Sequence, residues 1–322
     1  MSNLTQLAHR LLPPMMLLIA LAVASGAACG GGDDAPEESA TAEDIATDVE
    51  PTAPPIDSIT IGKSFWHAGW NVTLGEATLR QDELGTRTVT IDATFENLSN
   101  QTATFNSQVV LTSGGDSFGD TGIEQDLPNV PAGFSNDGLL AIRVDDAFSL
   151  DDATLTVGNP GNNQAIVPIG PDSPVELISL EPLQITSTGS ASAGPVSFTL
   201  TGVELRADLP DWLEEVEEGQ LAMIVSFEVT VGEGITVGEG VLQSENVALK
   251  LPDGTAVAVR TDGRSGVNEL LQGREGTTIQ DLSVRFIVDE PAAGQYAFVV
   301  RGPFGPNRAM VEGEVTFDVL AP

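Results

Sequence analysis

Residues 225–231 read Val-Ser-Phe-Glu-Val-Thr-Val, and this stretch decides the class of fold. Apolar residues alternate strictly with polar ones, so one side of an extended chain would face a core and the other would face water. The same alternation occurs at residues 89–95 and 282–288, and short turns rich in Gly, Pro and Asp punctuate the chain. No long apolar stripe at helical spacing competes with this pattern, and we predict an all-β fold.

One short acidic segment departs from the alternation. In residues 211–218, Asp211 and Glu214 have the spacing of a helix-capping pair. This segment is the best candidate for a helix in the chain.

The chain also repeats itself in order, first at a spacing of 126 residues and later at a spacing of 144. The matched pairs are 59–60 with 185–186, 73–74 with 199–200, and 144–146 with 288–290. Ordered matches at both ends of a unit indicate a duplication. Each unit has room for about seven or eight short strands. We predict two tandem immunoglobulin-like β-sandwich domains, residues 58–172 and 173–322.

The turn signals of the first unit resemble those of a known family. They are Gly69-Trp70-Asn71-Val72-Thr73-Leu74, Asn97-Leu98-Ser99, Asp116-Ser117-Phe118 and Val130-Pro131-Ala132-Gly133. Their order is similar to that of DUF4352-type immunoglobulin-like modules of bacterial lipoproteins. The second unit keeps a Pro-Asp-Gly turn at 252–254 but lacks the Asn-x-Ser turn. The resemblance implies a shared shape and supplies no catalytic residues.

The N-terminus resembles that of a bacterial lipoprotein. The apolar stretch at residues 11–24 contains two prolines, whereas a membrane-spanning helix needs about 20 apolar residues. Small residues at 25–28 precede the only cysteine, Cys29, as in a lipobox, although Gly26 stands where leucine is usual. We predict a signal peptide over residues 1–28 and lipidation of Cys29, which would anchor the chain in a membrane. An ordinary signal peptide is the alternative.

An acidic segment follows the cysteine. Residues 29–57 contain nine acids, four prolines and no Lys or Arg. Such a composition cannot bury enough apolar surface to fold, and its charges repel one another. We predict a disordered tether that holds the folded part outside the cytoplasm, on the bacterial cell envelope.

Charge and composition exclude several classes of function. The chain has 47 acidic and 13 basic residues, for a net charge of −34, and nucleic-acid binders need clusters of Lys and Arg. After cleavage of the signal peptide, His67 would be the one remaining histidine. Serine and cysteine nucleophiles usually need a histidine base. We therefore expect neither a nucleic-acid partner nor an enzyme.

Three residues are candidates for contact with a partner, which we expect to be an envelope or extracellular protein. Trp66, His67 and Trp212 combine amphipathic rings with neighbouring acids. The alternative is that these rings pack inside the chain. For Trp70 the core is favoured, because its repeat partner is Val196.

Two acidic loops are weak candidates for Ca²⁺, with Asp116 and Asp120 in one and Asp145 and Asp146 in the other. Carboxylates can bind Ca²⁺, but neither loop has the spacing of an EF-hand, and we expect no cofactor. The sequence favours a non-catalytic protein-binding or structural module. A Ca²⁺-dependent binding module, a protease inhibitor and a hydrolase with paired carboxylates are the alternatives.

Overall fold

The computed structural model describes residues 55–119, 126–235, 240–261, 266–271, 274–289 and 291–320. These residues form β-strands joined by turns and 3-10 helices, and none of them lies in an α-helix. The predicted all-β class is confirmed. Among them there is also no helix with the length and apolarity that crossing a bilayer requires. The predicted signal peptide, Cys29 and the tether up to residue 54 lie outside the described residues.

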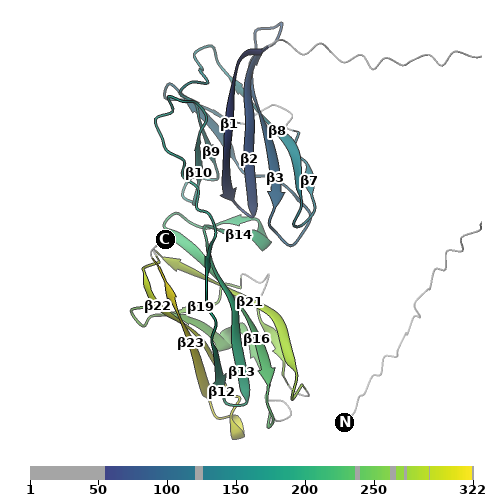
Figure 1. The fold of residues 1–322 in the computed structure, drawn as a ribbon, viewed down its shortest axis with the longest axis vertical. Coiled ribbons are helices and arrows are strands. Elements are labelled where there is room, and N and C mark those ends of the chain that lie inside the picture. Colours follow the sequence, from purple (N-terminus) through teal and green to yellow (C-terminus); the bar gives the residue numbers. More distant parts are fainter. Residues whose placement is uncertain are drawn as a thin grey trace, which may run out of the picture. The chain divides into compact units, whose positions relative to one another are not determined.

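Two antiparallel sheets form the first half of the described chain (Figure 1). Their strands are β1 (Pro55–His67), β2 (Trp70–Gln81), β3 (Arg87–Asn97), β5 (Val109–Ser113), β6 (Asp116–Gly119), β8 (Ser135–Val144), β9 (Thr154–Val157) and β10 (Ala165–Pro168). One sheet has the order β1-β2-β3-β8, and the other has the order β10-β9-β5-β6. The short strands β4 (Ala103–Thr104) and β7 (Asn129–Val130) pair with each other. The first strand includes Pro55–Asp57, which the sequence had placed at the end of the tether.

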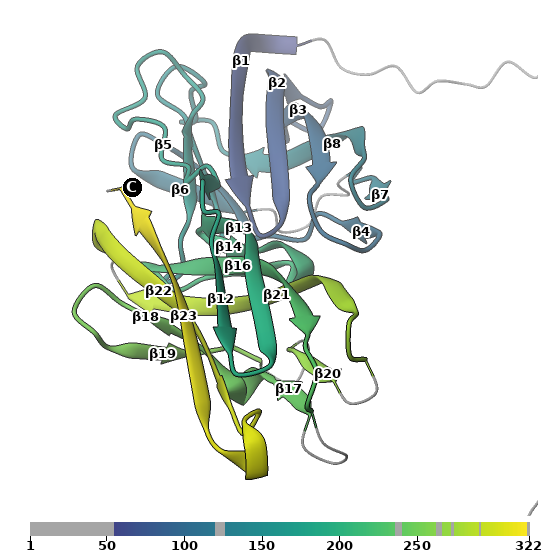
Figure 2. The ribbon, with the colours of Figure 1, turned by 60° about the horizontal axis from the view of Figure 1, so that its bottom comes forward.

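The second half has the same arrangement. Its larger strands are β11 (Leu183–Ile185), β12 (Ser190–Ala193), β13 (Val196–Arg206), β16 (Gln220–Val231), β18 (Val247–Lys250), β19 (Ala256–Ala258), β21 (Thr278–Asp289), β22 (Gly294–Gly302) and β23 (Val311–Val319). In one sheet β11 and β12 both pair with β13, which is followed by β16 and β21. The other sheet has the order β23-β22-β18-β19, with β22 and β23 as a long hairpin (Figure 2). The strands β17 (Val241–Gln243) and β20 (Asn268–Leu270) form a separate pair.

The sequence repeat coincides with equivalent positions in the sheets. Ser64 and Thr73 join β1 to β2 through a hydroxyl hydrogen bond of 2.8 Å. Ser190 and Thr199, each 126 residues further on, join β12 to β13 in the same way at 2.8 Å. Matched side chains thus occupy matched places in the two sheet orders.

Each half has its own hydrophobic core, and the alternating segments supply it. Every second residue is buried over residues 89–95 of β3 and 225–231 of β16, as the sequence predicted, and these residues are Val89, Ile91, Ala93, Phe95, Val225, Phe227, Val229 and Val231. In the first half, Leu111 and Leu155 of the opposite sheet belong to the same cluster as β3. The two sheets of this half therefore pack their apolar faces together in a β-sandwich-like arrangement.

Trp70 lies in the first core, as its repeat partner Val196 indicated. Only 1% of the residue is exposed. Its ring meets Phe95 edge-on at a centroid distance of 6.4 Å and Phe105 at 5.9 Å. Such edge-to-face pairs add to the free energy gained by burying the rings.

The helix expected at residues 211–218 is absent, and that prediction was wrong. Residues 211–218 belong to an insertion that begins three residues earlier. It is made of β14 (Asp208–Leu209), the 3-10 helix η1 (Pro210–Trp212) and β15 (Glu214–Glu215). Leu213 adopts a left-handed conformation with φ 54° and ψ 41°, which ends the turn and lets β15 pair with β14. A short acidic segment has little helical preference of its own, and the contacts described below decide its conformation.

Candidate functional site at the junction of the two halves

The tip of the β1–β2 hairpin lies against the insertion of the second half. Ala68 and Gly69 form the tip with φ angles of 47° and 81°. A Cβ atom at Gly69 would lie 2.8 Å from the carbonyl oxygen of Pro210. Glycine is required here because it accepts the positive φ and also permits this close approach.

Asp208 holds the hairpin tip through a buried carboxylate. Its Oδ2 accepts a hydrogen bond from the N–H of Gly69 at 2.5 Å, and its Oδ1 accepts one from Nε of Arg206 at 2.6 Å. The side chains of Arg206 and Asp208 are each 6% exposed. Burial disfavours the charged guanidinium, but the hydrogen bond and charge of Asp208, together with Glu204, raise the pKa of Arg206.

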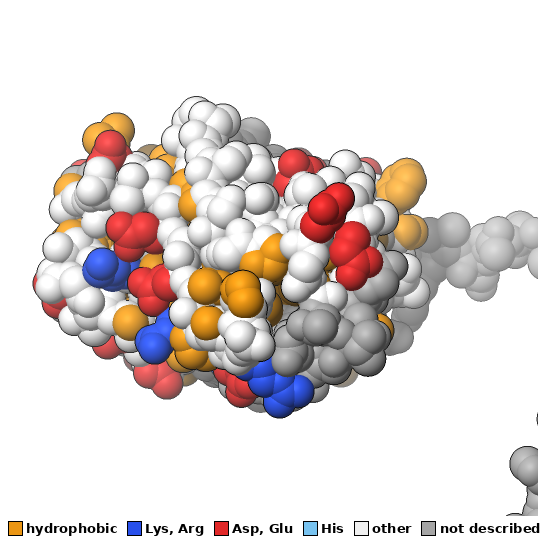
Figure 3. All heavy atoms as spheres, turned by 90° about the horizontal axis from the view of Figure 1, so that it is seen from below, with side chains coloured by type: hydrophobic (Ala, Val, Ile, Leu, Met, Phe, Trp, Pro, Cys, Tyr) orange, Lys and Arg blue, Asp and Glu red, His pale blue; other side chains and the backbone are white. Residues whose placement is uncertain are grey.

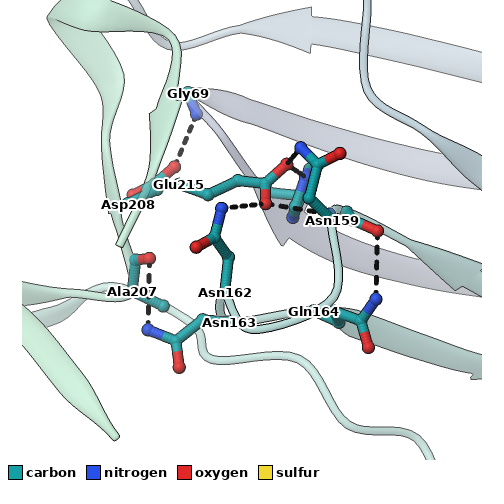
Figure 4. Close-up of polar contacts among 10 residues, drawn as sticks. Gly69, Asn159, Asn162, Asn163, Gln164, Ala207, Asp208 and Glu215 are labelled. Atoms are coloured by element: carbon teal, nitrogen blue, oxygen red, sulfur yellow. Dashed lines mark hydrogen bonds and ion pairs between the residues drawn. The ribbon is translucent and has the colours of Figure 1, made fainter. Parts of the chain in front are cut away.

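Glu215 is the centre of a second set of contacts, shown in Figure 4. Its Oε1 lies 3.1 Å from Nε2 of His67, and its Oε2 accepts hydrogen bonds from the backbone N–H of Asn159 at 3.0 Å and the amide of Asn162 at 2.9 Å. Burial of the carboxyl group raises its pKa, but these hydrogen bonds outweigh burial and lower the pKa of Glu215 to about 2. The carboxylate therefore stays ionised while only 8% of the side chain is exposed.

Backbone hydrogen bonds extend this contact along the loop that follows β9. The N–H of Asn163 donates to the carbonyl oxygen of Val216 at 2.8 Å, and its side-chain amide donates to the carbonyl oxygen of Gln220 at 2.8 Å. The N–H of Glu218 donates to the carbonyl oxygen of Gly161 at 3.0 Å. The loop of the first half and the insertion of the second are thus joined through main chain as well as side chains.

Trp212 lies in a stack of charged side chains within the second half. The guanidinium groups of Arg260 and Arg285 each lie 5.5 Å from the centre of its ring. Asp211 pairs with Arg285, and Glu214 lies 3.5 Å from Arg260. These cation–π contacts and ion pairs fix the ring and leave it half-buried.

The structure brings together only part of the predicted contact set. Trp66 and His67 line one small hollow together with Asp208, whereas Trp212 stacks on arginines instead. Trp66 is half-buried, and its backbone N–H donates to Oγ of Ser179 at 2.8 Å. His67 is 3% exposed and bonded within the chain, which leaves little of its ring for a partner.

Sequence reasoning did not identify the residues that hold the junction. Asp208 and Glu215 stand in an acidic insertion in which nothing distinguishes them from Glu214, Glu217 and Glu218. Residues 159–161 are Asn-Pro-Gly, which predicts a turn and says nothing of its partners. The backbone N–H and the side-chain amide of Asn159 donate hydrogen bonds to Glu215, 56 residues away, and no periodic pattern in the sequence indicates this contact.

The predicted Ca²⁺ loops carry no metal-binding cluster in the part of the chain that is described. Asp116 is exposed beside the β5–β6 turn. The side chain of Asp145 accepts hydrogen bonds from the N–H groups of Ala147 and Phe148, at 2.9 and 3.1 Å. Across the described ranges, no group of three or more His, Cys, Asp or Glu could hold a metal ion. Asp146 is exposed, and Asp120 lies outside those ranges.

The His67–Glu215 pair resembles part of a catalytic dyad, but the surroundings favour a structural role. A Cβ atom at Gly158 would lie 2.6 Å from Cε1 of His67 and 3.4 Å from Oε2 of Glu215. The loop therefore closes directly over the imidazole. A base in catalysis needs room at a ring nitrogen for the group whose proton it takes, and Nε2 of His67 already lies 3.1 Å from Oε1 of Glu215.

No protein-family model matches the chain, and no curated protein matches its sequence. The structure itself therefore defines the class: an all-β protein with repeated antiparallel sheets. Its charged residues at the junction bind one another and the backbone of the other half.

We expect replacement of Glu215 by Gln to change how stability depends on pH. The folded-state pKa of about 2 is below the ordinary value of 4.5. Glu215 therefore stabilises the fold fully above about pH 4.5, and this contribution is lost as the pH falls toward 2. Denaturant unfolding of both proteins should give a difference of about 2 kcal/mol at neutral pH that shrinks in acid. His67 is kept in both proteins, and a difference that stays constant down to about pH 2.5 would contradict the assignment.

Proposed function

We propose that the chain is a lipoprotein of the bacterial cell envelope, anchored through Cys29, whose folded part is a non-catalytic protein-binding or structural module outside the membrane. The observation that carries the non-catalytic role is that the acid–base side chains of the junction bind within the chain: His67 contacts Glu215, and Asp208 accepts hydrogen bonds from Gly69 and Arg206. The side chains of His67, Glu215 and Asp208 are at most 8% exposed. The lipobox-like order before Cys29 supports the anchor.

The sheet order supports a pair of immunoglobulin-like domains. With β1 set aside as an added edge strand, β2-β3-β8 and β10-β9-β5-β6 follow the order A-B-E and G-F-C-C′ of immunoglobulin sandwiches. The second half has the same order. This agreement favours the resemblance to DUF4352-type modules over an unrelated β-rich fold.

The charge distribution favours a protein partner over a nucleic acid. The chain carries a net charge of −34. On the face drawn in Figure 3, acidic and basic side chains are interspersed with apolar ones, and no basic patch covers it. Binding to phosphate backbones needs such a patch.

The anchor is tested by replacing Cys29 with Ser in the full gene. We expect the wild-type protein to enter the detergent phase and to show a mature N-terminus at Cys29 with the added mass of acyl chains. The variant should lack this mass and stay in the aqueous phase, because a chain with a net charge of −34 has little affinity for an anionic membrane.

A matched Ser25→Ala variant, four residues earlier in the chain, serves as the control. It should be acylated like the wild type. A wild-type protein cleaved at another residue and free of lipid would overturn the anchor and favour an ordinary signal peptide.

A further inference from the structure

The segment between the two halves runs along the edge of a sheet. After β10 the chain turns back, and Ile178 pairs with Ile166 in antiparallel fashion. Each of these two residues donates its N–H to the carbonyl oxygen of the other at 2.8 Å. We call residues 176–182 the connector edge, since they run from this bridge, which adds Ile178 to the sheet beyond β10, to the start of β11 at Leu183.

The outer side of the connector edge has open backbone groups. In the described part of the chain, the N–H groups of Leu177, Ser179 and Leu180 donate no hydrogen bond to another backbone group. In an antiparallel pair, the residues on either side of a bonded one point their N–H and C=O groups the opposite way. An open edge of this kind is a template for an added strand.

The connector edge also exposes apolar side chains. Leu177, Ile178 and Leu180 are between 45% and 49% exposed, and they fall within four residues. Single exposed apolar residues are normal, but a contiguous group of them marks an interaction surface. Trp66 lies next to this group, since its backbone N–H donates to Oγ of Ser179. Trp66 and Leu180 also line one small hollow together.

The charges on the connector edge are acidic. Glu176 and Glu181 are exposed among the apolar residues. The sequence has no Lys or Arg between Arg143 and Arg206. The nearby Lys63 on β1 directs its ammonium group to the carbonyl oxygen of Pro168. A second copy of this edge would bring like charges together, whereas a basic segment would pair with both carboxylates.

We propose that the connector edge binds an extended segment of a partner protein that carries both basic and apolar residues. The segment adds its backbone to the open edge, its apolar side chains pack on Ile178 and Leu180, and its basic side chains pair with Glu176 and Glu181. This assignment names the partner of the binding role proposed above. The anchoring at Cys29 is tested separately, so the failure of one leaves the other standing.

The experiment pans the immobilised full chain against a phage library of random linear peptides at physiological salt. We expect enriched peptides to carry both basic and apolar residues. A synthetic copy of one such peptide should bind about tenfold more weakly to an Ile178→Ser, Leu180→Ser double variant and to a Glu176→Gln, Glu181→Gln double variant. N-methylation of alternate backbone nitrogens of the peptide should weaken binding similarly, because the strand could no longer donate its hydrogen bonds.

The matched controls lie in the β2–β3 turn, which offers the same residue types. Leu84 is 92% exposed, and its neighbour Glu83 is exposed as well. A Glu83→Gln, Leu84→Ser variant should bind the peptide as the wild type does. The proposal is overturned if no basic–apolar peptide is enriched, or if the connector variants bind it as well as the control does. The connector variants are also tested with a peptide of consecutive lysines. If their affinity for that peptide falls by the same factor, the proposal is overturned, since that outcome means attraction by net charge alone.

Discussion

Replacing Asp208 with Ala is expected to cost about 3 kcal/mol of unfolding free energy, since removing one partner leaves a buried charge uncompensated. The guanidinium of Arg206 would keep Glu204 at 2.8 Å but lose its buried partner. The N–H of Gly69 would lose its acceptor at the same time. Urea unfolding followed by circular dichroism measures the loss.

Two further variants identify its cause. Asp318 is exposed, and its replacement by Ala should change stability by less than about 0.5 kcal/mol. Adding Arg206→Met to Asp208→Ala removes the unpaired charge, and the double variant should recover part of the loss. The loss of unfolding free energy in the double variant is compared with the sum of the losses in the Arg206→Met and Asp208→Ala single variants. Equal values would show that the pair acts through packing and not through charge.

Replacing Trp70 with Ala is expected to cost about 4 kcal/mol, the usual range for a fully buried large ring. The cavity would face Phe95 and Phe105, which now meet the indole edge-on. Trp66→Ala is the control on the same hairpin, and because Trp66 is half-buried its loss should be clearly smaller. Equal losses for the two variants would contradict the assignment of Trp70 to the core.

The same variant tests whether the two halves fold as separate domains. Phe298 is a fully buried ring of the second core, where it is 0% exposed and its ring lies 5.9 Å from Phe198 and 4.9 Å from Phe227. We expect calorimetry to show two transitions, with Trp70→Ala lowering one and Phe298→Ala lowering the other. A single transition lowered equally by both variants would mean one cooperative unit joined through the junction.

Much of the fold could be predicted because period-two alternation is a local property of the chain. Residues 225–231 alternate, and the structure buries every second one of them. The repeat added long-range information, since the pairing of Trp70 with Val196 indicated a core position before any contact was known. Strand positions and the core ring of the first half were therefore accessible from sequence.

Other features follow only from contacts between distant segments. Residues 211–218 have a capping pattern, yet they contain the short strand β15 in place of a helix, because Asp208 binds Gly69 and Glu215 binds His67. Those partners are 139 and 148 residues apart in the chain. The open N–H groups on either side of Ile178 likewise point outward only because Ile178 itself pairs with Ile166.

The sequence alone determined the all-β class, the alternation of the strands and the acidic character, because each depends on neighbouring residues or on composition. Tertiary structure alone decided which of the many carboxylates are buried and bonded and which edge stays open. The physical reason is that a buried carboxylate needs donors at hydrogen-bond distance, and only the folded chain brings those donors to Asp208 and Glu215.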